Sequence, residues 1–253
     1  MSQSEQTATV ICPECGGTGW ARVQRSGAEG VARCDCQKKG RAERLLANAK
    51  IPARYTHCDL ASFELSPRLT NQSHEKAKIA AEKFVREYPS SMPFGLLFIG
   101  PPGVGKTHLA VGIIKGLMKE KGVPCLFRTF PELLKEIQNS YSPISQSSEF
   151  SLLSPVLDAE VLVLDELGAQ TPSSWVKDTV SYIINYRYGE SKVTIFTTNY
   201  PDQAPGVGPK ASTYTLAERT GEQIRSRLFE MCKSLVITVN DFRQMVKQAE
   251  HHF

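Results

Sequence analysis

The chain has 253 residues, a net charge of +4, and 41% hydrophobic and 22% charged residues, a composition that is typical of a globular protein and excludes a largely disordered one. Its length suffices for one α/β core of about 150 to 200 residues with a small appended module. Because no apolar run approaches the roughly 20 residues that span a bilayer, and because the N-terminus lacks the layout of a secretion signal, we expect a cytoplasmic protein with no membrane contact.

The first expected module is a cysteine-rich segment that follows a polar tail at residues 1–11. It contains cysteines in two closely spaced pairs: Cys12, Cys15, Cys34 and Cys36. Because the segment has too few apolar residues to form a core, these thiolates predict a structural Zn²⁺ site of Cys₄ type, whose metal supplies the folding free energy. Disulfides are not expected in a protein that is not secreted.

Two alternatives remain open for these cysteines. The C-x-C spacing of the second pair is less usual than C-x-x-C, so His57 or Cys58 could replace one ligand. A redox-active pair is the other alternative. Cys125 and Cys232 lie in apolar runs and are expected in the core.

A basic helix and an irregular segment connect this module to the rest of the chain. Residues 37–50 predict the helix. Residues 33–54 are basic as a whole, which indicates either a solvated helix face or a surface for a polyanion or a protein partner. Residues 51–69 are interrupted by prolines and are predicted to be a linker. The expected organisation is an N-terminal module at 1–50, this linker, and an α/β domain at 70–253.

From residue 71 onward, helices and strands alternate. Helices are predicted at residues 71–88, 107–120, 131–139, 173–188, 216–231 and 241–253. Strands are predicted at residues 94–99, 123–128, 161–164, 193–197 and 235–239. Residues 140–151 and 200–213 are rich in serine, or in glycine and proline, and predict irregular connections. The alternation predicts a five-stranded parallel sheet with helices on both faces.

The residues between the first of these strands and the next helix carry the most specific motif. They follow the pattern G-x-x-x-x-G-K-T: Gly100, Pro101, Pro102, Gly103, Val104, Gly105, Lys106 and Thr107, followed by His108. In such a P-loop, glycines let successive backbone N–H groups surround a phosphate, and the helix N-terminus adds partial positive charge. We expect Lys106 to reach the β- and γ-phosphates and Thr107 to bind Mg²⁺, so the motif predicts a nucleoside triphosphate site.

Polar residues end two other buried strands at the same edge of the predicted sheet. Asp165 and Glu166 close the strand at 161–164. Asp165 is expected to hold Mg²⁺, and Glu166 to orient and polarise the attacking water. Asn199 follows the next strand and is expected to hydrogen-bond the γ-phosphate or that water, with a simple helix-cap role as the alternative. Together these residues predict hydrolysis of the bound nucleotide.

The motifs, in this order, resemble those of the AAA+ ATPases. The matching segments are GPPGVGKT at 100–107, VLVLDELG at 161–168, FTTN at 196–199 and GEQIRSRLFE at 221–230. Over roughly residues 51–245, the chain is most similar to the branch that holds the bacterial helicase loaders of the DnaC/DnaI type and the transposition ATPase IstB. The resemblance implies that Asp165 and Glu166 are the Walker B pair and that Asn199 is sensor 1.

The resemblance also assigns roles to arginines. Arg227 is implied as the arginine finger, which reaches the γ-phosphate bound by a neighbouring subunit, so that ATP would lie between subunits and drive self-assembly. Arg243 is implied as a sensor-2-like residue, although few residues follow the last strand and the helical lid is expected to be reduced or absent. Related loaders often carry an arginine where this chain has Gln223, which leaves room for Arg225 to share the finger's role.

Three functions are consistent with these motifs. The leading hypothesis is a helicase loader in DNA replication that binds a DnaB-type ring helicase through the zinc module, binds single-stranded DNA, and is switched by ATP. Tyr141, Ser173 and Trp175 are expected to contact the DNA, with Phe150 as a further stacking platform, whereas packing of Trp175 on its own helix is the alternative. The other hypotheses are an IstB-like transposition ATPase that binds duplex DNA and a transposase, and a non-catalytic adaptor gated by nucleotide.

Overall fold

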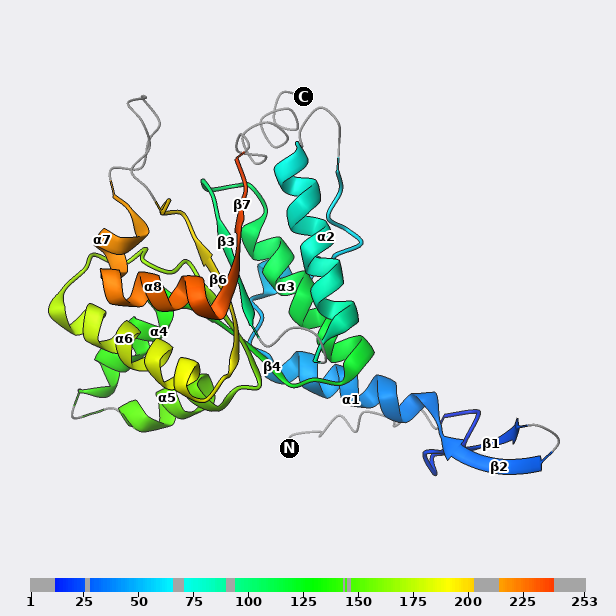
Figure 1. Cartoon of the computed structure of the whole chain (residues 1–253). Coiled ribbons are helices and arrows are strands. Elements are labelled where there is room, and N and C mark those ends of the chain that lie inside the picture. The colour runs from blue at the N-terminus through cyan, green and yellow to red at the C-terminus, as the bar shows by residue number, and fades with distance from the viewer. Residues whose placement is uncertain are drawn as a thin grey trace, which may run out of the picture.

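The computed structural model describes residues 12–25, 28–65, 71–89, 94–142, 144, 147–202 and 214–238. Figure 1 shows a central sheet between two layers of helices, with a narrow N-terminal extension that projects from the body. Within this described part of the chain, no helix has the length and apolar character that crossing a membrane requires.

The central sheet has five parallel strands in the order β4-β5-β6-β3-β7. They are β3 (Gly95–Ile99), β4 (Cys125–Thr129), β5 (Val161–Asp165), β6 (Val193–Thr198) and β7 (Cys232–Val236). β3 and β5 are buried along their whole length, as expected for parallel strands that are covered on both faces. The predicted α/β class and the parallel sheet are confirmed.

Alternate residues of the strands enter two separate cores. On one face lie α2 (Gln72–Glu87) and α3 (Lys106–Gly116), which continues as a π-helical turn through Leu117–Lys121. On the other face lie α4 (Phe130–Ser140), α5 (Glu149–Asp158), α6 (Ser174–Gly189), α7 (Leu216–Thr220) and α8 (Glu222–Met231). Because all the strands are parallel, the carboxyl ends of β3, β5 and β6 meet at one edge of the sheet (Figure 1).

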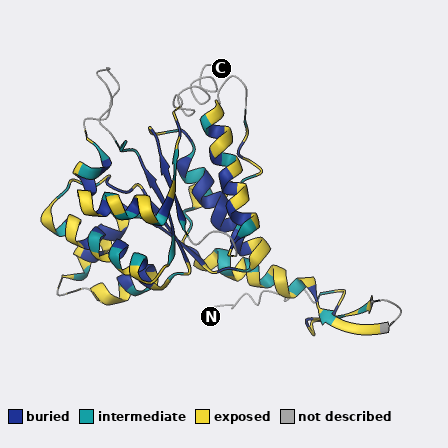
Figure 2. Cartoon of the chain, viewed as in Figure 1, coloured by how far each residue is buried: buried dark blue, intermediate teal, exposed yellow. Residues whose placement is uncertain are grey.

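The N-terminal extension consists of an antiparallel hairpin and a long helix: β1 (Trp20–Arg25), β2 (Ala28–Arg33) and α1 (Asp35–Asn48). Much of it is exposed, as the yellow ribbon in Figure 2 shows. The end of α1 is anchored to the body. The backbone N–H of Phe127 donates to the carbonyl oxygen of Ala49 at 2.8 Å, and Arg41 Nη2 donates to the carbonyl oxygen of Gly122 at 2.9 Å.

Residues 51–65, which include the short 3₁₀ helix η1 (Ala53–Tyr55), lie against α3. Lys115 Nζ donates to the carbonyl oxygen of Thr56 and to Asp59 Oδ2, both at 2.8 Å. Cys58 and Phe63 are buried in the core of this face. The described part of the expected linker therefore packs on the body, and residues 66–69 of that linker lie outside the described residues.

The connection between β4 and β5 corrects one prediction. α5 begins inside the stretch that was predicted to be irregular. Ser148 caps this helix by accepting a hydrogen bond from the backbone N–H of Ser151, and apolar residues such as Leu153 and Val156 are buried. The serine-rich composition of this stretch did not indicate a helix, because the helix is stabilised by the Ser148 cap and by the packing of its apolar residues.

The C-terminal third contains two further corrections. The helix predicted at 216–231 is split into α7 and α8 at Gly221, whose φ of 95° no helix interior adopts. β7 covers 232–236 rather than 235–239 because Cys232 already pairs with Gly95 of β3. The predicted helix at 241–253, the expected lid region and Arg243 lie outside the described residues.

Arg187 of α6 is fully buried and ties α5 to β6. Its guanidinium donates to the carbonyl oxygens of Val156, Leu157, Ala159 and Val193 and to the hydroxyl of Thr194. Burial lowers the pKa of Arg187 to about 10, so the side chain stays charged at neutral pH.

We expect Arg187→Leu to lower the free energy of unfolding by about 3 to 5 kcal/mol, because the buried acceptors would lose their donor. Urea unfolding of the full chain measures this loss. Arg86→Leu, at an exposed arginine of α2, is the matched control and should change stability by less than about 0.5 kcal/mol. Equal midpoints for the two variants would contradict the structural role of Arg187.

Candidate functional site

The predicted P-loop connects β3 to α3 at the carboxyl edge of the sheet. Gly105 has a φ of 88°, and a Cβ atom there would lie 2.6 Å from the ring of Phe63, so no larger residue fits between the loop and residues 51–65. The loop borders a cavity of about 400 Å³ together with Glu166 and Asn199. That volume lies in the range of roughly 300 to 1,000 Å³ that is typical of small-molecule sites.

Lys106 joins the loop to the end of β6. Its Nζ donates to the carbonyl oxygens of Gly100 and Pro101, both at 2.8 Å, and to Asn199 Oδ1 at 2.7 Å. The structure thus brings together two residues that lie far apart in the sequence and were both expected to contact a phosphate. The ammonium group of Lys106 can exchange these neutral oxygen acceptors for phosphate oxygens. Phosphate oxygens bind an ammonium group more strongly because they are charged.

Asp165 is buried at the end of β5 between two hydroxyl groups. Thr107 Oγ1 donates to Asp165 Oδ1 at 2.9 Å, and Thr197 Oγ1 donates to the same oxygen at 2.5 Å. Burial raises the pKa of the Asp165 carboxyl, and the two hydroxyl hydrogen bonds oppose this rise. A carboxylate in contact with a hydroxyl supplies the hard oxygen ligands that Mg²⁺ prefers, so Thr107 and Asp165 fit a magnesium site.

Glu166 follows Asp165 in an unusual backbone conformation, with a φ of 60°. Its backbone N–H donates to Thr197 Oγ1 at 3.0 Å, which fixes the turn, and its side chain lines the cavity. A positive φ in a residue other than glycine costs free energy and is concentrated at functional sites. The strained turn directs an exposed carboxylate to the same cavity as Lys106.

Another part of the cavity lining comes from the segment that precedes α2. Arg54, Tyr55, His57 and Cys58 line it. Sequence reasoning assigned no nucleotide contact to these residues, because they belong to no motif and reach the cavity only through the packing of residues 51–65 on α3. His57 and Cys58 form a separate group with His108 here, away from the N-terminal cysteines.

The two arginines of α8 lie outside this cavity's lining. Arg227 Nη1 donates to Asn185 Oδ1, and its guanidinium lies 5.8 Å from the centre of the Tyr188 ring. Arg225 forms an ion pair with Asp202 instead. Both arginines are half-buried. The described contacts of Arg227 are with residues of α6 in the same chain, and none of these contacts is with the P-loop.

Arg219 of α7 is a buried residue that sequence reasoning missed. Its guanidinium donates to the carbonyl oxygens of Gly168, Ala169 and Gln170, and it lies 4.7 Å from the centre of the Tyr200 ring. It therefore holds the turn that follows Glu166. The sequence signal that could have drawn attention to Arg219 is its position two residues before Gly221, where the GEQIRSRLFE segment begins.

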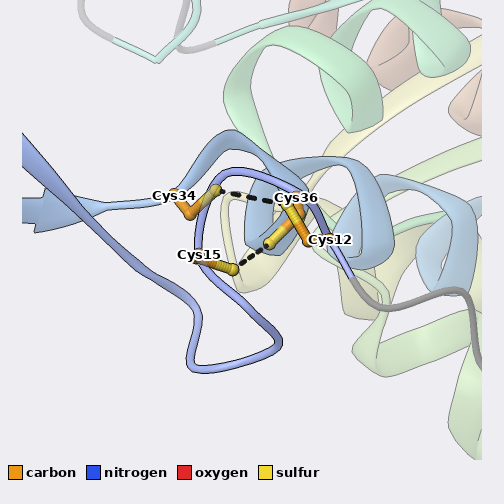
Figure 3. Close-up of side chains that lie close together, drawn as sticks. All are labelled: Cys12, Cys15, Cys34 and Cys36. Carbon is orange, nitrogen blue, oxygen red and sulfur yellow. Dashed lines mark hydrogen bonds between the residues drawn. The ribbon is translucent and has the colours of Figure 1, made fainter.

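The four N-terminal cysteines converge on one point, from the first turn and from the start of α1 (Figure 3). All of their sulfurs lie within 4.8 Å of one another, and the Cys12–Cys34 and Cys15–Cys36 sulfurs are 3.8 Å and 3.5 Å apart. A tetrahedron with Zn–S bonds of about 2.3 Å has edges of about 3.8 Å. The backbone N–H of Gly19 lowers the pKa of Cys15 to about 7, which favours its thiolate, whereas the neighbouring thiol of Cys15 raises the pKa of Cys36. This cluster fits a zinc ion without His57 or Cys58.

Cys15→Ser is expected to remove the metal and to unfold the hairpin β1–β2, because none of the described side chains of these two strands is buried. We expect about one zinc per chain in the wild type and less than about a tenth of that in the variant, while the body keeps its thermal midpoint. Metal analysis by mass spectrometry and a thermal scan measure both quantities. Cys125→Ser is the matched control and should keep the zinc. Equal zinc contents in wild type and Cys15→Ser would contradict the site.

The residues predicted to contact DNA lie near one another. Tyr141 follows α4, Trp175 lies in the first turn of α6, and their ring centres are 6.5 Å apart in an edge-on arrangement. Ser173 caps α6 by accepting from the backbone N–H of Val176. Tyr141 and Phe150 are largely exposed. Trp175 packs partly on the core, so both the stacking and the packing roles remain compatible with its position.

Comparisons with known proteins agree with this geometry. A family model described as IstB-like ATP binding protein matches residues 32–248. The replicative helicase loader DnaC of Buchnera aphidicola subsp. Acyrthosiphon pisum is 25% identical over 235 residues, which cover 92% of this chain and 87% of that protein. A crystal structure of the DnaC helicase loader has a TM-score of 0.62 and 34% identity, over 74% of this chain and 99% of that chain. The structure of DnaI has a TM-score of 0.60 and 28% identity, over 76% of this chain and 95% of that chain.

Proposed function

This chain belongs to the IstB-like ATP-binding family of AAA+ proteins, among the relatives of the DnaC and DnaI helicase loaders, and from that premise we propose that it loads a DnaB-type ring helicase onto single-stranded DNA under the control of ATP. The observation that carries the proposal is the 34% identity to a DnaC helicase loader over 99% of that chain, and it is supported by the meeting of Lys106, Glu166 and Asn199 at one cavity. The chain would act in DNA replication.

ATP binding rests on the residues at the carboxyl edge of the sheet. The loop from Gly100 to His108 would hold the phosphates through its backbone N–H groups and through Lys106. Thr107 and Asp165 would hold Mg²⁺, which neutralises phosphate charge when it is bound. The hydrogen bond between Thr107 and Asp165 supports this assignment because it places the two ligands side by side.

Hydrolysis would be carried by residues around that loop. The Glu166 carboxylate is exposed at the cavity and would accept a hydrogen bond from the attacking water, which orients it toward the γ-phosphate. Asn199 would hydrogen-bond the γ-phosphate once Lys106 turns from Asn199 to the nucleotide. Arg227 would act on the nucleotide of a neighbouring chain, so that ATP binding assembles the protein and hydrolysis releases it.

A pull-down with the host's replicative ring helicase tests the proposed partner. The full-length chain with ATP and Mg²⁺ should retain the helicase, and Cys15→Ser should retain much less of it, because we assign the docking role to the N-terminal zinc module. Failure of the full-length chain to bind the helicase would refute the loader assignment.

An IstB-like transposition ATPase is the second candidate, and the family model that covers residues 32–248 favours it. In that role the chain would bind duplex DNA and a transposase. Preference for duplex over single-stranded DNA in the presence of ATP, together with retention of a transposase instead of a helicase, would select this candidate.

Trp175→Ala is expected to weaken ATP-dependent binding of single-stranded DNA by about 1 to 3 kcal/mol, because one base would lose its stacking partner. Fluorescence anisotropy of a labelled oligonucleotide measures the affinity. Tyr182→Ala removes another exposed aromatic ring of α6 and serves as the matched control. Unchanged affinity in Trp175→Ala would contradict a DNA contact at this residue.

A further inference from the structure

The two faces of the hairpin β1–β2 differ in exposure. In an antiparallel pair, directly opposite residues share a face, and successive residues alternate between the faces. One face therefore holds three cross-strand pairs: Trp20 with Arg33, Arg22 with Val31, and Gln24 with Glu29. All six residues of this hairpin face are exposed, and Trp20 and Val31 are 54% and 67% exposed. The described side chains of the opposite face are half-buried: Ala21, Val23 and Ala32.

The cysteine cluster fixes one end of the hairpin face. Trp20 and Arg33 form the ladder pair next to that cluster. Directly beyond this pair, the backbone N–H of Cys34 donates to the carbonyl oxygen of Gly19 at 2.8 Å, and the backbone N–H of Gly19 donates to Cys15 Sγ at 3.3 Å. Both strands are thus tied to residues that fit the zinc ion. Figure 1 shows the hairpin at the tip of the N-terminal extension, away from the central sheet, so its exposed face is open to a ligand.

The charges of the hairpin face are mainly positive. They belong to Arg22, Arg33 and, toward the turn, Glu29. None of the ion pairs among the described residues involves either arginine. Arg33 lies across the ladder from Trp20, and Arg22 lies two positions along the same strand, so two guanidinium groups flank one exposed indole ring. A guanidinium group is always charged and can bind phosphate oxygens with two donors.

We propose that the hairpin face binds single-stranded nucleic acid, with Trp20 stacked on an unpaired base and Arg22 and Arg33 bound to the adjacent phosphates. This contact lies on a different module from the nucleotide cavity and from Trp175, so it adds to the proposed function without requiring ATP. A protein partner fits this face less well. Only Trp20 and Val31 are apolar on it, whereas a stable protein interface buries about 800 Å² per partner around an apolar centre.

Fluorescence anisotropy of labelled oligothymidylate tests the stacking on the full-length, zinc-loaded chain without nucleotide. Trp20→Ala should weaken binding by about fivefold or more, because one base loses its stacking partner. Trp20→Phe should stay within about twofold of wild type, because an aromatic ring remains. Tyr182→Ala, which removes an exposed ring of α6, is the matched control. An oligouridylate of the same length should show the same loss, and the more tightly bound strand identifies the ligand as DNA or RNA.

Two results would overturn the stacking proposal: wild-type affinity in Trp20→Ala, or no binding of either strand by the wild-type chain without nucleotide. Neither result bears on the ATP-dependent contact at Trp175, which is measured separately. The zinc content of each variant should equal that of the wild type. This control separates a lost contact from an unfolded hairpin.

The salt dependence of binding tests the phosphate contacts and does not require any change at Trp20. Each phosphate contact with a single strand contributes about 0.7 to the slope of log K against log salt concentration, so Arg22→Gln combined with Arg33→Gln should reduce that slope by about 1.4. Arg86→Gln, at an exposed arginine of α2, should leave it unchanged. An unchanged slope in the double variant would overturn the proposal. Loss of the ring helicase in a pull-down with unchanged strand affinity would assign the face to a protein and overturn it as well.

Discussion

Replacing Arg227 with alanine is expected to lower the kcat of ATP hydrolysis by about 10³-fold or more, within the range that arginine fingers contribute. The guanidinium of Arg227 is not among the groups that line the cavity of its own chain, in the described part of the structure. It is held on α6 by Asn185 and Tyr188. Its proposed target is therefore the nucleotide of a neighbouring chain. Affinity for ATP should remain within about threefold of wild type, because the variant's own P-loop is intact.

Steady-state release of phosphate measures this effect, with Arg86→Ala on the exposed side of α2 as the control. Mixing Arg227→Ala chains with Lys106→Ala chains gives a sharper result. The first variant supplies a P-loop and the second supplies the arginine, so mixed assemblies should regain part of the activity that neither variant has alone. A kcat of Arg227→Ala close to wild type, or no recovery on mixing, would contradict a site shared between chains.

Lys106→Ala is expected to lower the affinity for ATP by about 100-fold or more, because the triphosphate would lose the charged donor that we propose for its β- and γ-phosphates. Lys106 also links the loop to Asn199 at 2.7 Å, so its removal takes away the contact between the P-loop and the end of β6. Hydrolysis should fall by a similar or greater factor. Titration with a non-hydrolysable ATP analogue separates binding from turnover.

The control for this variant is Lys83→Ala, at a lysine of α2 that is about half exposed. It should bind the analogue as wild type does. Binding of the analogue by Lys106→Ala with wild-type affinity would contradict the assignment of residues 100–107 as the phosphate-binding loop. Because this variant is expected to fail in ATP-dependent assembly as well, its mass in solution with and without ATP gives an independent readout.

The parallel sheet and the candidate site at its carboxyl edge were predictable because each of their residues is marked by a local sequence pattern. The P-loop is contiguous, and Asp165 and Asn199 each follow an apolar strand, so parallel pairing alone brings them to one edge. The clustering of the N-terminal cysteines was also predictable, because two closely spaced cysteine pairs in a segment with few apolar residues are typical of a metal site.

What the sequence did not reveal depends on packing between distant segments. Arg54 and His57 reach the cavity only because residues 51–65 pack on α3, and no periodic pattern marks that contact. Two helix boundaries differ from the predicted ones, at Gly221 and at Ser148. A single glycine and a serine cluster indicate such boundaries only weakly.

We propose that this chain, with ATP, places a ring helicase on single-stranded DNA. The most direct measurement is the amount of the host's replicative helicase retained on closed circular single-stranded DNA after incubation with ATP and the full-length chain. We predict that the wild-type chain raises this amount well above that of helicase alone and that Lys106→Ala does not. Equal retention of the helicase with and without the wild-type chain would contradict the account.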